Sequence, residues 1–169
     1  MFKQAVEITP EMARKLAQVA YDMKVEFYVA PYEANAQLAF MFISGRVHAV
    51  ITEDENLLAF GVERCFLRMD ANGYGKEFDL SLLNKASEFG RFTKDMLLFA
   101  CIISGCDYLD PLEGMDFKIA QKLVHECGAD YKEIAKKIRR EYMIPHNYES
   151  EFEKALLTFK FQRVYCPKK

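Results

Sequence analysis

Short apolar runs in the first half of the chain are separated by longer segments with helical spacing. Val25–Val29 and Val47–Ile51 lack regular polar alternation, as expected of strands that are covered on both faces. Between them, residues 32–43 repeat apolar side chains at helical spacing and stop before Gly45. Helix, strand, helix and strand in this order, with short joints, predict parallel strands connected by right-handed crossovers. A third strand is predicted at Arg64–Met69.

Helix signals lie on both sides of these strands. Thr9-Pro10-Glu11 combines an N-cap residue, a proline suited to the first turn and an acid at the positive helix end, which predicts a helix to about Met23. After a turn at residues 70–75, the segment Phe78–Leu83 is predicted to lead into a helix that ends near Gly90.

The second half is predicted to be helical. Thr93 caps a run that reaches Ile103, and turn residues then dominate positions 105–116. Three more helices are predicted at 117–127, 130–141 and 148–161. The predicted fold class is α/β, with a mostly parallel sheet flanked by helices at 1–90 and a helical part at 91–169. We expect the two parts to pack as one compact unit.

Composition excludes several classes of protein. The chain has 169 residues, of which 51% are hydrophobic and 28% charged, so it suits one folded domain and not a disordered chain. No run approaches the roughly 18 apolar residues that cross a bilayer, and the N-terminus lacks the apolar region of a secretory signal. We therefore expect no membrane partner. Five cysteines without C-x-x-C spacing argue against a disulfide framework or a zinc site and favour cytosol or nucleus.

The net charge of -2 is unevenly distributed. Residues 1–84 carry 8 basic and 12 acidic side chains, whereas residues 85–169 carry 15 basic and 13 acidic ones. The bases gather at Lys132, Lys136, Lys137, Arg139 and Arg140. This is not the strongly basic balance of a stand-alone nucleic-acid binder. It suits an acidic metal centre beside a modest phosphate-contacting surface, and equally an ordinary soluble surface.

Three consecutive acids, Glu53-Asp54-Glu55, follow the predicted strand Val47–Ile51. Open α/β sheets build their sites at the C-terminal ends of strands, and adjacent carboxylates need water or a cation to offset their repulsion. Taken alone, the triplet is more typical of a solvated acidic turn. Two further polar stretches, at residues 30–37 and 104–108, are the reason to consider a site.

Three stretches carry a resemblance to a known family: residues 29–38 around Glu33, 51–61 around Asp54 and 101–109 around Asp107. In the order and spacing of these stretches, and over most of its length, the chain resembles the flap endonuclease / XPG family of 5′ nucleases. The resemblance implies a PIN-like 5′ nuclease fold, followed by a helix–two-turn–helix motif in the helical part.

The resemblance also implies a site for two Mg²⁺ ions that catalyses phosphodiester hydrolysis. Glu33, Asp54 and Asp107 match catalytic metal ligands of the family, and hard oxygen ligands are those that Mg²⁺ prefers. Asn35 and Asn56 match two further metal-ligand positions, where the family has acids. An amide keeps the shape and one carbonyl oxygen but loses the charge, so the site is expected to be two negative charges short.

A hairpin that binds duplex phosphates, often with a K⁺ ion, is implied at residues 112–120. Gly114, Lys118 and Lys122 are its expected DNA-binding residues. Asp116 replaces the second glycine of the family's hairpin and puts negative charge where a phosphate would bind. Non-specific DNA affinity depends on neutralising phosphates, so we expect it to be weakened.

Two classes of function are consistent with these residues. The first is the internal domain of a metal-dependent 5′→3′ DNA nuclease of repair, nuclear, acting on 5′ ends, flaps or nicked duplex, with repair proteins as partners. The second is a catalytically degenerate nuclease fold that binds nucleic acid or a protein as a scaffold. The family's core begins with a further N-terminal region. We therefore expect a fragment, half of a split protein or a reduced copy, and no DNA hydrolysis by this chain alone.

Overall fold

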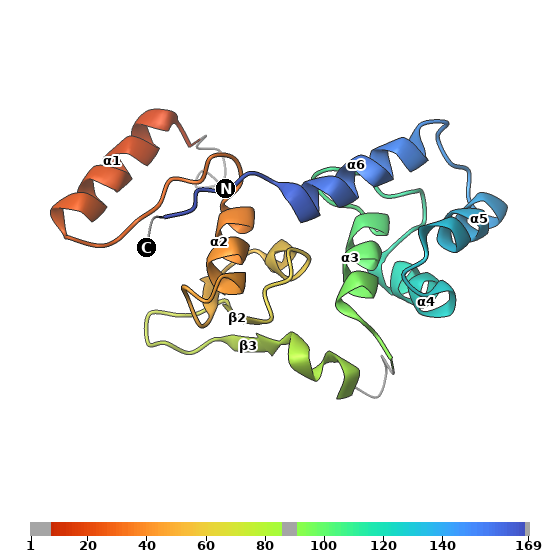
Figure 1. The fold of residues 1–169 in the computed structure, drawn as a ribbon, viewed down its shortest axis with the longest axis horizontal. Helices are drawn as coiled ribbons and strands as arrows, with labels where there is room; N and C mark the ends of the chain where they lie inside the picture. Colours follow the sequence, from red (N-terminus) through yellow and green to blue (C-terminus); the bar gives the residue numbers. More distant parts are fainter. Residues whose placement is uncertain (1–7, 86–90, 168–169) are drawn as a thin grey trace, which may run out of the picture.

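The computed structural model describes residues 8–85 and 91–167. Its α-helices are α1 (Pro10–Asp22), α2 (Ala34–Ile43), α3 (Lys94–Ile103), α4 (Phe117–Cys127), α5 (Tyr131–Glu141) and α6 (Tyr148–Phe161). Its strands are β1 (Val50–Thr52), β2 (Arg64–Leu67) and β3 (Lys76–Asp79), with 3-10 helices η2 (Glu55–Leu58) and η3 (Leu80–Lys85). In Figure 1, α2 and the strands form one part, α3, α4 and α5 form the other, and α6 runs back from the second toward the first.

The sheet has three strands in the order β1-β2-β3 and is mixed. β1 pairs with β2 in parallel, with Val50 opposite Cys65, whereas β2 pairs with β3 in antiparallel fashion. The predicted α/β class is confirmed, but the expectation of a mostly parallel sheet covered on both faces is wrong in detail. Val50 is buried in β1, whereas its neighbour Ile51 is 60% exposed, so only one face of this strand meets the core.

The strand predicted at Val25–Val29 is also wrong. This segment is not part of the described sheet, and Val25 and Val29 are 54% and 75% exposed. A β-rich run becomes a strand only where a partner offers backbone hydrogen bonds, and the parallel partner of β1 is β2 instead. The Tyr28 ring in this segment lies 6.0 Å from that of Tyr165, near the other end of the chain.

The segment from Phe78, which was predicted to lead into a helix, forms a strand and a 3-10 helix instead. Lys76–Asp79 pairs with β2 as β3, and Leu80–Lys85 forms the 3-10 helix η3. The antiparallel partner offered by β2 decided this, since Phe78 lies opposite Cys65 and the backbone is extended there. The predicted end near Gly90 lies outside the described residues.

The predicted helix starts are confirmed by their caps. Thr9 accepts a hydrogen bond from the Met12 amide at 3.3 Å, and Thr93 accepts one from Met96 at 3.2 Å. α1 nevertheless has no buried residue. Figure 1 shows it standing away from the other helices. No helix among the described residues is both long and apolar enough to span a membrane.

The core is centred on α3, which has seven buried residues. On one side the Phe99 ring lies 5.4 Å from that of Phe152 in α6. Between the two parts of the molecule, Phe60 and Phe159 have ring centroids 4.8 Å apart. The buried apolar residues form one cluster from β1 to α6, and this cluster fixes α2, η2 and the turn after α3 relative to one another.

Candidate functional site

Glu33 lies at the start of α2, where Pro31 and the extended backbone of Glu33 end the preceding segment. It occupies the N-cap position, but its side chain makes no capping hydrogen bond. The carboxylate instead accepts hydrogen bonds from the Tyr108 hydroxyl and, at 3.3 Å, from the Gln162 amide nitrogen. Its partners therefore come from the turn after α3 and the segment after α6.

Asn35 joins the start of α2 to the start of η2. It is 8% exposed, and its amide nitrogen donates a hydrogen bond to Asp54 Oδ2 at 2.6 Å. The other Asp54 oxygen caps η2 and accepts from the Asn56 backbone amide at 2.9 Å. The Thr52 hydroxyl accepts from the Asp54 backbone amide at 3.0 Å. Both carboxylate oxygens of Asp54 are thus held by neutral donors.

Asp107 follows α3 in a tight turn. Gly105 has a φ of +101°, and a Cβ there would lie 2.7 Å from Pro111 Cδ, so the turn requires glycine. Cys106 and Leu109 exchange backbone hydrogen bonds of 2.9 and 3.2 Å across it. Asp107 itself is exposed, while its neighbour Tyr108 points its hydroxyl at Glu33.

The structure therefore brings the elements that carry the three predicted acids into one hydrogen-bonded group. Asn35 links α2 to Asp54, and Tyr108 links Glu33 to the Asp107 turn. It does not gather the acids themselves. Across residues 8–85 and 91–167, no three His, Cys, Asp or Glu side chains come together closely enough to hold a metal ion. The oxygen donors suit a hard cation, but the described residues do not gather enough of them to hold one, and amide and hydroxyl donors hold the Glu33 and Asp54 carboxylates.

Tyr108 is kept protonated by its surroundings. Burial, and then its hydrogen bond to Glu33, raise the pKa of the Tyr108 hydroxyl well above its usual range. A neutral hydroxyl is a donor to a carboxylate, which is the role that Tyr108 has toward Glu33. The Tyr108 ring also packs edge-on against Phe159, at 5.1 Å between centroids.

The predicted hairpin lies at the N-terminus of α4. Gly114 has a φ of +78°, and the Met115 amide donates to the Leu112 carbonyl at 2.9 Å. Asp116 is the N-cap of α4, where its carboxylate accepts from the Ile119 amide at 2.8 Å. An N-terminal helix amide of the kind that binds phosphates is thus already bound to a carboxylate of the protein itself.

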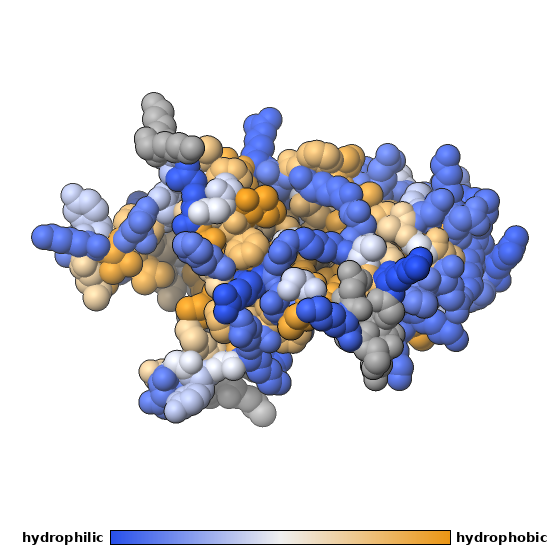
Figure 2. Space-filling view, turned by 60° about the horizontal axis from the view of Figure 1, so that its bottom comes forward, coloured by the Kyte–Doolittle hydropathy of each residue, from blue (hydrophilic) through white to orange (hydrophobic). Residues whose placement is uncertain are grey.

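Lys118 and Lys122 stand four residues apart on α4 and are exposed. With Gln121 and His125 they line a shallow hollow on this helix. Figure 2 shows hydrophilic side chains gathered over the right-hand end of the molecule, where Figure 1 places α4 and α5, whereas apolar surface lies toward the centre and left.

Three residues of this site were missed as functional by the sequence analysis. Tyr108 lay within a family stretch but carried no predicted role, and Gln37 did so too. Gln162 had no signal at all, because it is 129 positions from Glu33 in the chain. Sequence spacing cannot predict such a contact. The predicted ligands Glu33, Asn35 and Asp54 do lie in this hydrogen-bonded group.

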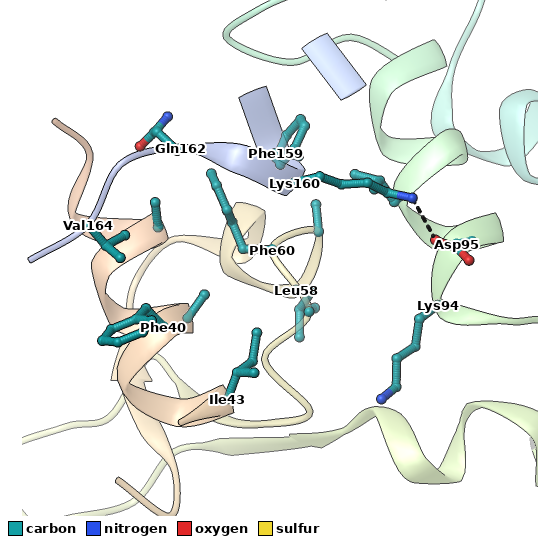
Figure 3. Close-up of a pocket in the computed structure, with 15 residues that line it drawn as sticks. Phe40, Ile43, Leu58, Phe60, Lys94, Asp95, Phe159, Lys160, Gln162 and Val164 are labelled. Carbon is teal, nitrogen blue, oxygen red and sulfur yellow. Dashed lines mark hydrogen bonds and ion pairs between the residues drawn. The ribbon is translucent and has the colours of Figure 1, made fainter. Parts of the chain in front are cut away.

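One groove near the site runs between the two parts of the molecule. It has a volume of about 370 Å³ and is lined by α2, η2, the start of α3 and the end of α6. Figure 3 shows Phe60 and Phe159 in it, with the Lys160–Asp95 ion pair of 3.3 Å at its rim. The acids predicted as ligands do not line it. Gln162 lines the groove and also donates a hydrogen bond to Glu33.

The sequence of this site is that of a known family. Residues 24–107, which include Glu33, Asp54 and Asp107, match the XPG I-region family. Relatives from plants, animals and fungi are 30% or more identical over nearly the whole chain. The chain belongs to the flap endonuclease / XPG family.

Its curated relatives include exonuclease 1. The exonuclease 1 of Arabidopsis thaliana is 44% identical over 169 residues, which are 98% of this chain and 23% of that protein. The exonuclease 1 of Oryza sativa subsp. japonica is 44% identical over 168 residues, 98% of this chain and 20% of that protein. The chain thus spans about a quarter or less of the length of these relatives.

Solved structures share the fold. The catalytic core of Rad2 in complex with a DNA substrate has a TM-score of 0.78 at 18% identity, over 96% of this chain and 59% of that one. GEN1 in complex with product DNA and Mg²⁺ has a TM-score of 0.71 at 18% identity, over 95% and 44%. GEN-1 binding potassium has a TM-score of 0.72 at 19% identity, over 94% and 46%. The fold is that of the 5′ nucleases.

Proposed function

We propose that this chain is the internal region of an exonuclease-1-like 5′→3′ DNA nuclease, and that by itself it does not hydrolyse DNA. Membership of the family supports the first statement, since exonuclease 1 relatives match along nearly all of the chain. The substrate would be a 5′ end, flap or nicked duplex, with Mg²⁺ as cofactor and K⁺ at the hairpin. The setting would be nuclear DNA repair with other repair proteins, and residues 1–90 and 91–169 would act as one unit.

The hydrogen bond between Asn35 and Asp54 carries the second statement. Two carboxylates that face one another repel, and a divalent cation between them offsets this repulsion. Asparagine instead supplies an amide donor, here 2.6 Å from the Asp54 oxygen. The pair is satisfied without any cation, so the attraction for a metal ion is lost at the position where the family has an acid.

The charge of the group supports the same conclusion. In a carboxylate cluster, two divalent ions can activate a water and stabilise the leaving oxygen of a phosphodiester. Such ions need several anionic ligands, because the substrate phosphate is itself an anion. Asn35 and Asn56 leave Glu33, Asp54 and Asp107 as the acids at the matched ligand positions, and Asp54 is already held by neutral donors.

A scaffold function is the second candidate, and Asp116 favours it. The Asp116 carboxylate caps α4 at 2.8 Å from the Ile119 amide, so it competes with a phosphate for this helix end. DNA binding through Gly114, Lys118 and Lys122 would then be weak. In this role the fold would bind nucleic acid or a protein without cutting.

A cleavage assay tests the proposal. The chain is incubated with a 5′-labelled flap duplex and Mg²⁺ or Mn²⁺, beside a variant with Glu33→Ala and Asp54→Ala. We expect the parent chain to give no more product than the variant, with either Mg²⁺ or Mn²⁺. Cleavage that exceeds the variant would refute the proposed inactivity of the chain and leave its family assignment intact.

A further inference from the structure

The segment after α6 crosses α2 and is tied to it at several points. We call residues 162–167 the strap. Figure 3 shows it leaving α6 beyond Phe159 and passing Gln162 and Val164 above α2. It begins beside the N-terminal end of α2 with Gln162, and its Pro167 carbonyl accepts from Arg46, beyond the C-terminal end of α2, at 2.6 Å. The strap is thus hydrogen-bonded to residues that flank both ends of this helix.

Gln37 is the main tie. It is 4% exposed, and apart from Asn35 it is the only polar residue counted as buried among the described residues. Its amide nitrogen donates to the Tyr165 carbonyl at 2.8 Å, and its carbonyl accepts from the Tyr165 amide at 2.7 Å. One side chain therefore satisfies both backbone groups of a strap residue, as a neighbouring strand would. This fixes the distance between strap and helix.

At its start the strap reaches Glu33. The Gln162 amide nitrogen lies 3.3 Å from Glu33 Oε2 and 3.5 Å from the Tyr108 hydroxyl, which itself donates to Glu33. Glu33 makes no capping bond to its own helix. The direction of its carboxylate is therefore set by two donors that come from distant parts of the chain.

We propose that the strap holds the Glu33 carboxylate in place, with Gln162 as the positioning residue in contact and Gln37 as the positioning residue that anchors the strap. The inference rests on the proposed function only where it concerns metal binding. Partners that orient a ligand side chain set metal affinity, and their loss costs about 10- to 100-fold. The alternative is that the strap only holds α6 against α2, in which case Glu33 is indifferent to it.

The first test needs no metal. Gln162→Met and Gln37→Met keep length and volume but remove the amide, and Gln18→Met removes a matched amide–carboxylate hydrogen bond of 2.9 Å, to Asp22 on the exposed α1. The readout is the ¹³C signal of the Glu33 carboxyl, assigned by its loss in Glu33→Gln. We expect it to move in both strap variants and to stay in Gln18→Met, while Gln162→Met unfolds at the same denaturant concentration as the parent. An unmoved signal in Gln162→Met would overturn the proposal.

The second test measures affinity for Mn²⁺ by calorimetry in a chain that carries Asn35→Asp and Asn56→Asp. We expect Gln162→Met to weaken it about tenfold or more in this background, and Gln18→Met to leave it unchanged. Equal affinity in Gln162→Met would overturn the positioning role. If the background chain binds no Mn²⁺, the strap is judged by the Glu33 signal alone, and the proposed function is judged separately by the cleavage assay.

Discussion

At the start of η2 and at the start of α4, an aspartate carboxylate accepts hydrogen bonds from N–H donors, but the residues involved differ in burial. At η2, the buried amide of Asn35 donates to the Asp54 carboxylate, where the family has a second acid. At α4, the exposed Asp116 carboxylate accepts from the Ile119 amide, where the family has a glycine. Under the proposed function, the Asn35 amide occupies the place of a cation and the Asp116 carboxylate that of a phosphate.

The difference in burial between Asn35 and Asp116 predicts which substitution changes the free energy of unfolding more. Charge at a buried position cannot be screened by water or salt, whereas an exposed carboxylate at a helix end interacts through high dielectric. Changing Asn35 back to an acid should therefore alter the free energy of unfolding strongly, while changing Asp116 should mainly alter affinity for DNA.

The largest effect is expected from the pair Asn35→Asp, Asn56→Asp. In EDTA, an acid at position 35 would face the Asp54 carboxylate without a donor, so we expect the free energy of unfolding to fall by about 3 kcal/mol. Mn²⁺ at about a hundred times its dissociation constant should return about 2.7 kcal/mol. Denaturant unfolding with and without Mn²⁺ measures both.

A matched control is Asn147→Asp, at the exposed N-cap of α6. It adds an acid without a carboxylate neighbour in the group and should change stability by no more than a few tenths of a kcal/mol. If the double variant is as stable as the parent in EDTA, the Asn35 amide does not hold Asp54. The expected difference in stability effect between positions 35 and 116 is then wrong.

Asp116→Gly should raise affinity for duplex DNA roughly fivefold, because a charge about 4 Å from a phosphate is worth about 1 kcal/mol in water. Fluorescence anisotropy at two salt concentrations measures the change. Asp130→Gly is the control, since Asp130 caps α5 in the same way, at 2.9 Å from the Lys132 amide. An equal gain in both variants would show that lost negative charge alone, and not the hairpin position, is responsible.

Lys118→Ala and Lys122→Ala sharpen the second half of the comparison. Each should weaken duplex binding by roughly threefold and lower the slope of log affinity against log salt by about 1, if each lysine contacts a phosphate. Lys15→Ala, on the exposed α1, removes the same charge from another region and should leave the slope unchanged. A slope unaffected by all three would exclude this face of α4 as the DNA contact.

The smallest effect concerns two tyrosines outside the group at α2. The hydroxyls of Tyr131 and Tyr148 are buried and, within the part of the chain that the structure describes, have no hydrogen-bond partner. Burial raises the pKa of each to about 12. The ordinary value is near 10, so the folded state resists ionisation more than the unfolded state. Stability should hold below about pH 10 and fall as pH rises toward 12.

Tyr148→Phe should reduce this alkaline loss and change stability at pH 7 by less than about 1 kcal/mol, because no hydrogen bond is given up. Unfolding midpoints at pH 7, 10 and 11 provide the measurement. Tyr74→Phe, at a ring that is 76% exposed, serves as control. A Tyr148→Phe variant that loses more than about 1 kcal/mol at pH 7 would show that this hydroxyl does have a partner.

Local signals in the sequence predicted most of the helices. Thr9, Thr93 and Asp130 mark helix starts because a side-chain oxygen satisfies an amide a few residues away, which is a local event. The strand at Val25–Val29 could not be excluded in the same way. Whether an extended run joins a sheet depends on a partner elsewhere, and here β1 pairs with β2.

The site divides in the same manner. The stretches around Glu33, Asp54 and Asp107 predicted the family, which the relatives confirm. The direct Asn35–Asp54 hydrogen bond and the hold of Gln162 on Glu33 were not predictable, since they join residues 19 and 129 positions apart.

The sequence alone determined the types of donor and acceptor: which acids remain, which two became amides and which glycine became Asp116. Only the tertiary structure decided that Asn35 donates to Asp54 and that Tyr108 and Gln162 donate to Glu33. Hydrogen bonds have a reach of about 3 Å, so the partners of these side chains depend on which elements the core brings together. Here α2 lies beside η2, the Asp107 turn and the strap, and this neighbourhood supplied neutral donors to two of the remaining acids.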